Sequence, residues 1–378
     1  MTKRALFCFN TARFAAHHRL DLLRASQRQG LEIHVACPEG KETEILISEG
    51  FTVHTLNLSR KGINPLREIL TLFQLNKIVR KIRPHIFQAF TIKPVIYGAV
   101  VCKFHKNVQA FLTVTGLGSA AIAKSPSKRL LWWLIRQLYK WSLSASQSTL
   151  VFQNDTDQKL FTQFKLIAPA RTKIIPGTGV NIKLFSTNLP PFSSPTIIYA
   201  GRIIKDKGLV ELVCACKKLA NENIEFNLLI YGELDLGNPS HFTSKEWQEL
   251  CQLSFVDCKG FQRDLTQVLA RARIACLPSY REGFPLFLLE AGAAGLPSVS
   301  TDVPGCNALV TDQYNGLLVP AQDTNALYAA LKLLLKDSKL AQKLGENAKN
   351  HVAKYYDQQH IIAEYLELYS QEEQSKAA

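Results

Sequence analysis

The chain has 378 residues, of which 47% are hydrophobic, and a formal net charge of +14 at pH 7. This length and apolar content suffice for two ordinary domains. No stretch reaches about 18 apolar residues without charge, so no transmembrane helix is expected. Low-complexity segments and fixed-period repeats are also absent from the sequence, which excludes a repeat architecture.

The positive charge is concentrated in the first half of the chain. Residues 1–190 carry 27 Lys and Arg against 9 Asp and Glu, a net charge of +18. Residues 191–378 carry 18 against 22, a net charge of −4. No acidic residue occurs between Glu68 and Asp155, so we expect the first half to face an anionic partner. A nucleic acid is not expected, because the basic residues form no recognised nucleic-acid-binding module.

The first half alternates between strand-like and helix-like segments. Strands are expected at residues 5–9, 32–37, 50–56, 84–90, 108–114 and 148–152, and helices at 14–29, 42–48 and 64–83. The run at 5–9 follows a basic start but is too short for the core of a signal peptide, so we expect it to be the first strand. This serial order predicts an α/β domain with a doubly wound parallel sheet.

Residues 124–141 form a basic segment that is rich in tryptophan and leucine. Pro126 can open a helix there, and the cations Lys128, Arg129, Arg136 and Lys140 are interleaved with three Trp and several Leu. A basic amphipathic helix of this composition is typical of one that lies on an anionic bilayer. The alternative is an ordinary domain helix whose aromatic residues belong to the core.

The second half begins after a stretch at residues 187–195 that is rich in Pro and Ser, which is the best candidate for a linker. Helices are expected at 324–335 and 339–355, and an amphipathic segment at about 357–372 has no strand after it. We therefore expect domains at 1–190 and 191–355, followed by a terminal helix at 356–378. The nine cysteines contain no CxxC pair and no zinc-site spacing, and a chain of this size needs no disulfide scaffold, which favours reduced thiols in the cytosol.

A glycine-bearing loop with cations joins a strand at 197–200 to a helical pattern at 209–213. Arg202 offers a planar fork suited to phosphate, and Lys207 offers a mobile point charge. Together they can neutralise a diphosphate without a metal, at about 1.5–3 kcal/mol for each charge-assisted hydrogen bond. The alternative is a solvated basic loop.

Two carboxylates, Glu282 and Glu290, have seven residues between them and follow an apolar run at 274–279 that is typical of a buried strand. Gly283 and Pro285 are expected to open a helix, whose free N–H groups suit an anion. Ligands of open α/β sheets bind at such strand ends. The alternative is a pair of Glu on an exposed helix face, which the apolar residues between them and the turn into a buried strand at 295–300 disfavour.

These two motifs resemble those of family 4 glycosyltransferases, the retaining enzymes of the GT-B fold, most strongly over residues 174–320. The resemblance implies two Rossmann-like domains around a central cleft and a last helix that crosses back to the first domain. It also implies that Glu290 binds the nucleotide ribose, Glu282 the donor sugar and the loop at 259–261 the base. The expected nucleotide-binding residues are Gly201, Gly260, Phe261, Gly283, Phe284, Pro285, Leu286 and Glu290.

Segments that end strands of the first domain resemble those of bacterial family 4 enzymes that extend lipid-linked oligosaccharides, especially N-acetylgalactosaminyltransferases. The acceptor-side candidates are Asn10, Thr11, His17, Lys93, Thr115 and Gly116. Many family members have a His near the strand that ends at Gly116, and this chain has none. We therefore expect the backbone of Thr115 or Gly116 to line the site instead.

The function that follows is retaining transfer of an N-acetylhexosamine or hexose from a nucleotide sugar, by resemblance a UDP-sugar, to a lipid-linked saccharide. Arg202, Lys207 and Glu282 are the expected catalytic residues, and no metal or other cofactor is required. The expected location is the inner face of the cell membrane, with peripheral attachment through residues 124–141. The alternatives are a GT-B sugar-nucleotide epimerase and a non-catalytic membrane-associated binding protein.

Overall fold

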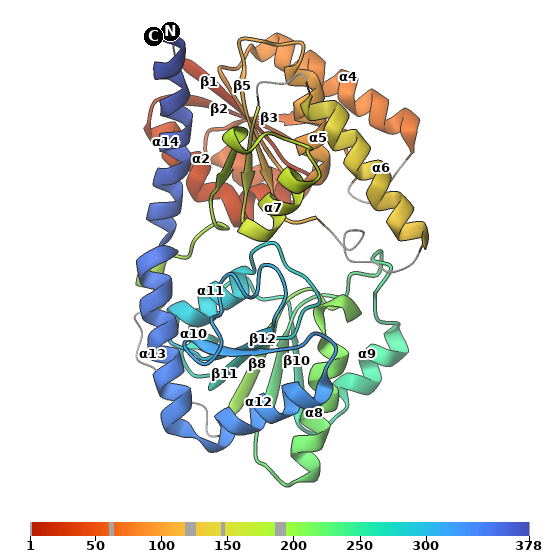
Figure 1. Ribbon diagram of the computed structural model, residues 1–378, viewed down its shortest axis with the longest axis vertical. Coiled ribbons are helices and arrows are strands. Elements are labelled where there is room, and N and C mark those ends of the chain that lie inside the picture. Colours follow the sequence, from red (N-terminus) through yellow and green to blue (C-terminus); the bar gives the residue numbers. More distant parts are fainter. Residues whose placement is uncertain (1, 60–63, 118–125, 145–147, 186–193, 378) are drawn as a thin grey trace. The chain divides into compact units, whose positions relative to one another are not determined.

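The computed structural model describes residues 2–59, 64–117, 126–144, 148–185 and 194–377. The chain divides into two compact units, one made of Met1–Thr178 with Ile361–Ala378 and the other of Gly179–His360. Figure 1 shows that each unit is a sheet flanked by helices. The expected domain boundary at residue 190 lies outside the described residues.

The first unit contains a seven-stranded parallel sheet in the order β3-β2-β1-β4-β5-β6-β7. Its strands are β1 Lys3–Cys8, β2 Leu31–Cys37, β3 Thr52–Thr55, β4 Ile86–Phe90, β5 Gln109–Val114, β6 Thr149–Phe152 and β7 Thr172–Ile174. Every residue of β4, β5 and β6 is buried because helices cover both faces of the sheet. The six expected strands are confirmed, and β7 was not anticipated.

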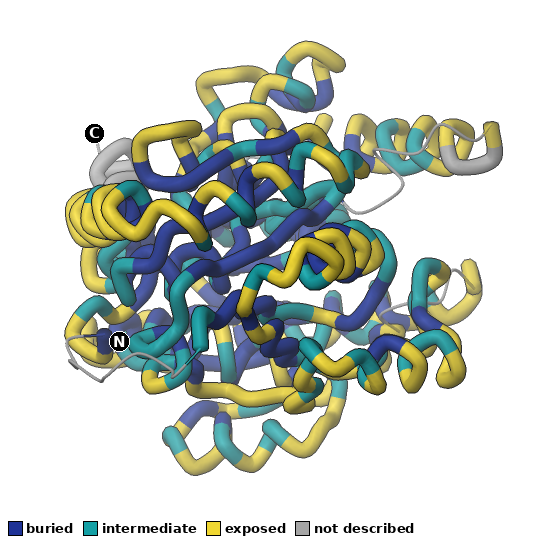
Figure 2. The backbone as a smooth tube through the Cα atoms, turned by 90° about the horizontal axis from the view of Figure 1, so that it is seen from below, coloured by how far each residue is buried: buried dark blue, intermediate teal, exposed yellow. Residues whose placement is uncertain are grey.

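Helices pack on each face of this sheet. They are α1 Ala12–Phe14, a π-helical turn at Ala15–Arg19, α2 Leu20–Arg28, α3 Thr43–Ser48, α4 Pro65–Ile82, α5 Ile92–Cys102, α6 Pro126–Leu143, α7 Asp155–Gln163 and α14 Gln358–Ala377. One hydrophobic core holds the inner faces of α4, α5 and α6. The other holds α1, α2 and the part of α14 that follows residue 360. Figure 2 shows the buried strands in dark blue and the exposed outer faces of the helices in yellow.

The start of α4 follows directly from its sequence. The side chain of Asn64 accepts a hydrogen bond from the N–H of Leu66 at 3.1 Å, and Pro65 occupies the first helical position. At the other end, Arg83 adopts a left-handed conformation with φ of 51° and terminates the helix. The expected helix at 64–83 is confirmed.

The second unit contains a six-stranded parallel sheet in the order β10-β9-β8-β11-β12-β13. Its strands are β8 Thr196–Ala200, β9 Asn227–Tyr231, β10 Val256–Gly260, β11 Ile274–Leu277, β12 Ser298–Thr301 and β13 Gly316–Val319. Its helices are α8 Leu209–Asn221, α9 Ser244–Cys251, α10 Thr266–Leu269, α11 Leu286–Ala293, α12 Thr324–Lys336 and α13 Ser338–Tyr355. Because β8 and β11 are neighbours at the centre of the sheet, the loops that follow them meet.

The expectation that all cysteines are reduced thiols is wrong for one pair. Cys251 at the end of α9 and Cys258 in β10 form a disulfide, with their Cα atoms 5.8 Å apart. The chain reverses direction between the helix and the edge strand, which brings two thiols seven residues apart into bonding range. The two cysteines are not part of a CxxC motif, so no local motif predicted this disulfide.

Candidate functional site

The loop after β8 carries the first cationic motif. Gly208 ends it in a left-handed conformation with φ of 72°, and a Cβ there would lie 1.9 Å from the carbonyl oxygen of Pro278, which follows β11. Only glycine permits this approach. The loop after β8 is therefore held directly against the loop after β11.

Lys207 and Glu282 form an ion pair across these two loops, between Nζ and Oε1. Both side chains are largely enclosed, with exposed fractions of 15% and 11%. The N–H of Glu282 donates to the carbonyl of Pro304 at 3.1 Å, and a Cβ on Gly305 would lie 2.6 Å from the carbonyl oxygen of Glu282. The loop after β12 thus fixes the backbone of Glu282, and the two sequence motifs share one site.

Arg202 is anchored by an acidic residue that the sequence analysis missed. Its Nη1 lies 3.2 Å from Oδ2 of Asp235, which follows β9, and the Arg202 side chain is half exposed. The carbonyl of Arg202 accepts a hydrogen bond from the hydroxyl of Tyr199 at 3.0 Å. These contacts hold the guanidinium at the carboxyl edge of the sheet. No local spacing links Arg202 to a residue 33 positions away.

Glu290 lies in the second turn of α11 and makes no side-chain hydrogen bond within the described part of the chain. Burial raises the pKa of its carboxyl to about 8, and the nearby charge of Asp264 adds to this effect. Asp264 itself accepts hydrogen bonds from the N–H and hydroxyl of Thr266 at the start of α10. Asp264 is not among the residues expected from the sequence.

The other expected nucleotide-binding residues also lie in the second unit. Gly260 ends β10 with φ of 73°, and the side chain of Phe261 is exposed. Phe284 packs edge-on against Tyr356 at 5.3 Å between ring centroids, so its ring contributes to the core. Pro285 is the N-cap of α11 and Leu286 its first helical residue. Pro285 therefore opens the helix as expected, as its N-cap.

The acceptor-side candidates of the first unit follow three neighbouring strands, β1, β4 and β5. Asn10 and Thr11 come after β1, and the Thr11 hydroxyl caps α1 by accepting the N–H of Phe14 at 3.1 Å. Thr115 and Gly116 come after β5. The carboxyl ends of parallel strands lie at one edge of a sheet, so the structure gathers these backbones there.

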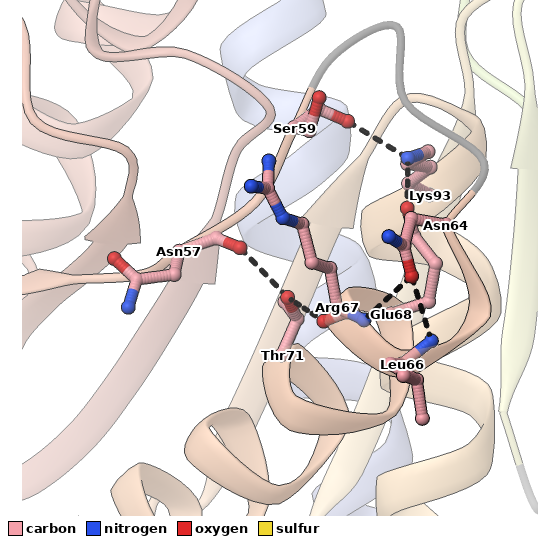
Figure 3. A network of polar contacts seen from close by, with 8 residues as sticks. All are labelled: Asn57, Ser59, Asn64, Leu66, Arg67, Glu68, Thr71 and Lys93. Atoms are coloured by element: carbon pink, nitrogen blue, oxygen red, sulfur yellow. Dashed lines mark hydrogen bonds and ion pairs between the residues drawn. The ribbon is translucent and has the colours of Figure 1, made fainter.

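Lys93 and His17 have acidic neighbours. Figure 3 shows Nζ of Lys93 donating to Oε1 of Glu68 at 2.6 Å and to the carbonyl of Ser59 at 2.8 Å. Nε2 of His17, in the π-helical turn, lies 3.7 Å from Glu42. Both side chains are thus engaged in contacts within the first unit.

Thr91, the residue directly after β4, has an unusual backbone. Its φ is 73°, a left-handed conformation that is rare for a β-branched residue, and its hydroxyl is buried without a partner. Such strain is concentrated at functional sites. A β-branched residue gives no sequence signal of a positive φ.

Within the described ranges, no group of three or more His, Cys, Asp and Glu is arranged to hold a metal ion. Among the same residues, no helix combines the length and the hydropathy that are needed to cross a bilayer.

Comparison with known families covers both units. The family "Glycosyl transferase 4-like" matches residues 6–154, and the family "Glycosyl transferases group 1" matches residues 183–351. The protein is a glycosyltransferase. The two matches together cover most of the chain, and they confirm the recognition of a family 4 glycosyltransferase from the sequence.

Two relatives of this glycosyltransferase are similar along most of its length. One is N,N'-diacetylbacillosaminyl-diphospho-undecaprenol alpha-1,3-N-acetylgalactosaminyltransferase of Campylobacter jejuni, 28% identical over 93% of this chain and 94% of the relative. Another is UDP-Gal:alpha-D-GlcNAc-diphosphoundecaprenol alpha-1,3-galactosyltransferase of Escherichia coli, 20% identical over 85% of this chain and 84% of the relative.

Solved structures establish the fold. Sucrose-phosphate synthase of Thermosynechococcus elongatus has a TM-score of 0.81 at 21% identity and covers 99% of this chain and 100% of its own. HepE of Anabaena, solved with UDP-glucose, has a TM-score of 0.77 at 18% identity and covers 96% of this chain and 99% of its own. The glycosyltransferase has the GT-B fold, as the sequence predicts.

Proposed function

We propose that this glycosyltransferase moves an N-acetylhexosamine or hexose from a UDP-sugar to a lipid-linked saccharide during bacterial polysaccharide synthesis, with retention of configuration. The names of the Campylobacter jejuni and Escherichia coli relatives, which both act on undecaprenol-diphosphate saccharides, support this acceptor class. The acid-poor, strongly positive first half of the chain suits a diphosphate-linked acceptor on an anionic surface.

The observation that carries the proposal is the enclosed pair of Lys207 and Glu282, with Arg202 on the same loop as Lys207. In the proposed reaction the bond between the anomeric carbon and the diphosphate oxygen breaks, and the diphosphate keeps the electron pair. Lys207, Arg202 and the N-terminus of α11 stabilise the developing negative charge. The acceptor hydroxyl attacks from the same face, and the leaving oxygen takes its proton. Glu282 holds Lys207 and orients the donor hydroxyls.

Glu290 is the proposed ribose ligand. Its carboxyl lies on α11, the helix that follows the loop of Glu282. It is available for hydrogen bonds because it makes none within the described part of the chain. A nucleotide ribose offers two hydroxyl donors to such a group. A nucleotide sugar is then the only co-substrate required besides the acceptor, and no metal takes part.

We also propose peripheral attachment to the cytoplasmic face of the cell membrane through α6. Of its aromatic residues, Trp132 packs against the core, whereas Trp133 and Trp141 are exposed. Arg129 and Lys140 are exposed beside them. Arg136 differs from the expectation because its guanidinium lies 4.2 Å from the ring centroid of Phe164. Reversing the four cations of this segment to Glu should release the protein from anionic vesicles, and persistent binding would contradict the role of α6.

The decisive experiment is nucleotide release from UDP-, GDP- and ADP-sugars, with and without a polyprenyl-diphosphate saccharide. Release that depends on the acceptor, from one donor, would establish transfer and identify the sugar, and NMR of the product would give the anomeric configuration. Glu290→Ala should weaken UDP binding by about tenfold, the loss of one or two hydrogen bonds at about 0.5–1.5 kcal/mol each. Conversion of the donor to its epimer without an acceptor would refute the proposal.

A further inference from the structure

The face of α4 that points away from the core carries four large apolar side chains. They are Leu66, Ile69, Leu70 and Phe73, with exposed fractions of 72%, 49%, 66% and 68%. Their spacing of i, i+3, i+4 and i+7 places them on one stripe of the helix. We call these four residues the α4 stripe. Contiguous apolar surface of this kind marks an interaction site rather than ordinary scatter.

The orientation of α4 is set by its opposite face. Leu75, Val79 and Ile82 are buried in the first unit. The Thr71 hydroxyl donates to the carbonyl of Asn57 at 2.7 Å (Figure 3). The stripe therefore points outward from a helix that is well packed on its other face, and its exposure does not result from a poorly packed helix.

Positive charge continues the stripe toward the end of the helix. Lys77 and Arg80 follow Phe73 at i+4 and i+7, so they extend the same face, and both are exposed. The only acid on α4 is Glu68, and its carboxylate is paired with Lys93. The outer face thus has an apolar first half and a cationic second half, the pattern of a helix that lies in the boundary of an anionic bilayer.

The α4 stripe belongs to the same side of the sheet as α6. The inner faces of both helices share one hydrophobic core, and α5 packs against each of them. Figure 1 shows α4 and α6 as outer helices of the first unit. The exposed side chains of α6, including Trp133, Leu138 and Trp141, give the same sheet face a second apolar surface.

We infer that the α4 stripe is a membrane-inserting surface, whose occupant is the acyl boundary of an anionic bilayer and whose cations contact lipid phosphates. This inference rests on the proposed function for its membrane context. A second copy of the chain is a poorer occupant, because its α4 face would set only the same cations or apolar side chains against Lys77 and Arg80, and no opposite charge. A bilayer supplies both the apolar layer and the opposite charge.

The test is co-sedimentation with vesicles of phosphatidylglycerol and phosphatidylcholine. Leu70→Ser/Phe73→Ser should lower vesicle partitioning by at least about tenfold, since two large apolar contacts are lost. The matched control is Val210→Ser/Leu333→Ser, which removes two exposed apolar residues from helices α8 and α12 of the second unit and should leave partitioning unchanged. Equal partitioning of the stripe variant and the unmodified protein would overturn the inference.

Three further measurements separate the remaining outcomes. The variant Phe73→Trp should bind vesicles as well as the unmodified protein, and brominated acyl chains should quench the fluorescence that the new tryptophan adds. If that added fluorescence is not quenched, the inference is overturned, even if the serine variant fails to fold. A dimer that the serine variant abolishes, seen by sedimentation velocity without vesicles, would assign the stripe to a second copy and overturn it as well. Donor turnover with a water-soluble acceptor should be equal in both proteins, so absence of transfer refutes the proposed function and leaves the membrane result interpretable.

Discussion

The carboxyl of Glu290 is expected to contribute to the pH dependence of the stability of the second unit. Burial raises its pKa to about 8 in the folded protein, whereas an unfolded Glu titrates near its ordinary value of about 4.3. Between these two values the folded state binds the extra proton, so stability falls as pH rises from about 4.3 to about 8. Below about pH 8 the buried carboxyl therefore keeps its proton and is uncharged.

Glu290→Gln should therefore stabilise the protein without ligand at pH 8 by on the order of 1–2 kcal/mol, since the amide has no charge to desolvate. Below pH 4 the difference should vanish, because the carboxyl of Glu290 is then protonated in both the folded and the unfolded state. Urea unfolding at a series of pH values measures this. The control is Glu249→Gln, a carboxyl on the exposed side of α9. A difference between Glu290→Gln and the unmodified protein that is constant across pH would contradict the assignment.

Lys207 provides a second test at the scale of one residue. Lys207→Met keeps the length of the side chain and removes the charge, which leaves the enclosed Glu282 without its cation. If Lys207 stabilises the leaving diphosphate, kcat should fall by about 10²–10³, the usual loss for one preorganised donor. Lys205→Met, on the same loop but paired with Glu246, is the control and should retain most of the activity. Similar kcat values for the two variants would exclude Lys207 from the chemistry.

At the scale of elements, the disulfide joins α9 to the edge strand β10, directly before the loop of Gly260 and Phe261. An edge strand has a neighbour on one side only, so the cross-link restrains the part of the sheet that is least well held. Closing a loop of this length removes conformational freedom from the unfolded chain and contributes about 2–3 kcal/mol.

Cys251→Ser/Cys258→Ser should lower the free energy of unfolding of the air-oxidised protein by this amount, and dithiothreitol should produce the same change in the unmodified protein only. Denatured, oxidised protein should show 7 free thiols of the 9 cysteines. Cys214→Ser, which removes an exposed free thiol, is the control for the substitution itself. Nine thiols in the oxidised protein would show that the two sulfurs are close but unbonded.

Features that depend on local interactions were predictable from the sequence, and features that depend on residues distant in sequence were not. Strands such as β4 and β11 were predictable because a short apolar run is a local signal. Helix α5 was not anticipated, since its buried residues surround the whole helix and leave no polar face with a helical period. Asp235 lies 33 positions from Arg202, and Asp264 lies 26 positions from Glu290, whose pKa it raises; no local pattern encodes either relation.

The α4 stripe shows the opposite limit. In a sequence, Leu66, Ile69, Leu70 and Phe73 look like the buried face of a helix, because periodicity reports that a helix has an apolar face but not where that face points. Only the packing of Leu75, Val79 and Ile82 shows which side is covered. A sequence pattern therefore does not distinguish an exposed apolar surface that binds a partner from the buried face of a helix.

At the scale of the whole molecule, residues 361–369 of α14 complete the core of the first unit. Tyr365 and Tyr369 are buried, and the ring of Tyr369 lies 5.2 Å from that of Phe111. The Tyr369 hydroxyl donates to Oε1 of Gln88 at 3.0 Å. The two ends of the chain thus belong to one folding unit, and the second unit is inserted between them.

This organisation predicts that a substitution in the last helix weakens the unit at the other end of the sequence. Tyr365→Ala should destabilise the first unit by about 3–5 kcal/mol, the usual cost of a large buried aromatic side chain. Calorimetry should show a lower transition temperature for that unit alone. UDP identifies the second unit, because a ligand raises the transition of the unit that binds it. If Tyr365→Ala shifts the UDP-sensitive transition by the same amount, the two units unfold together and the insertion does not separate them energetically.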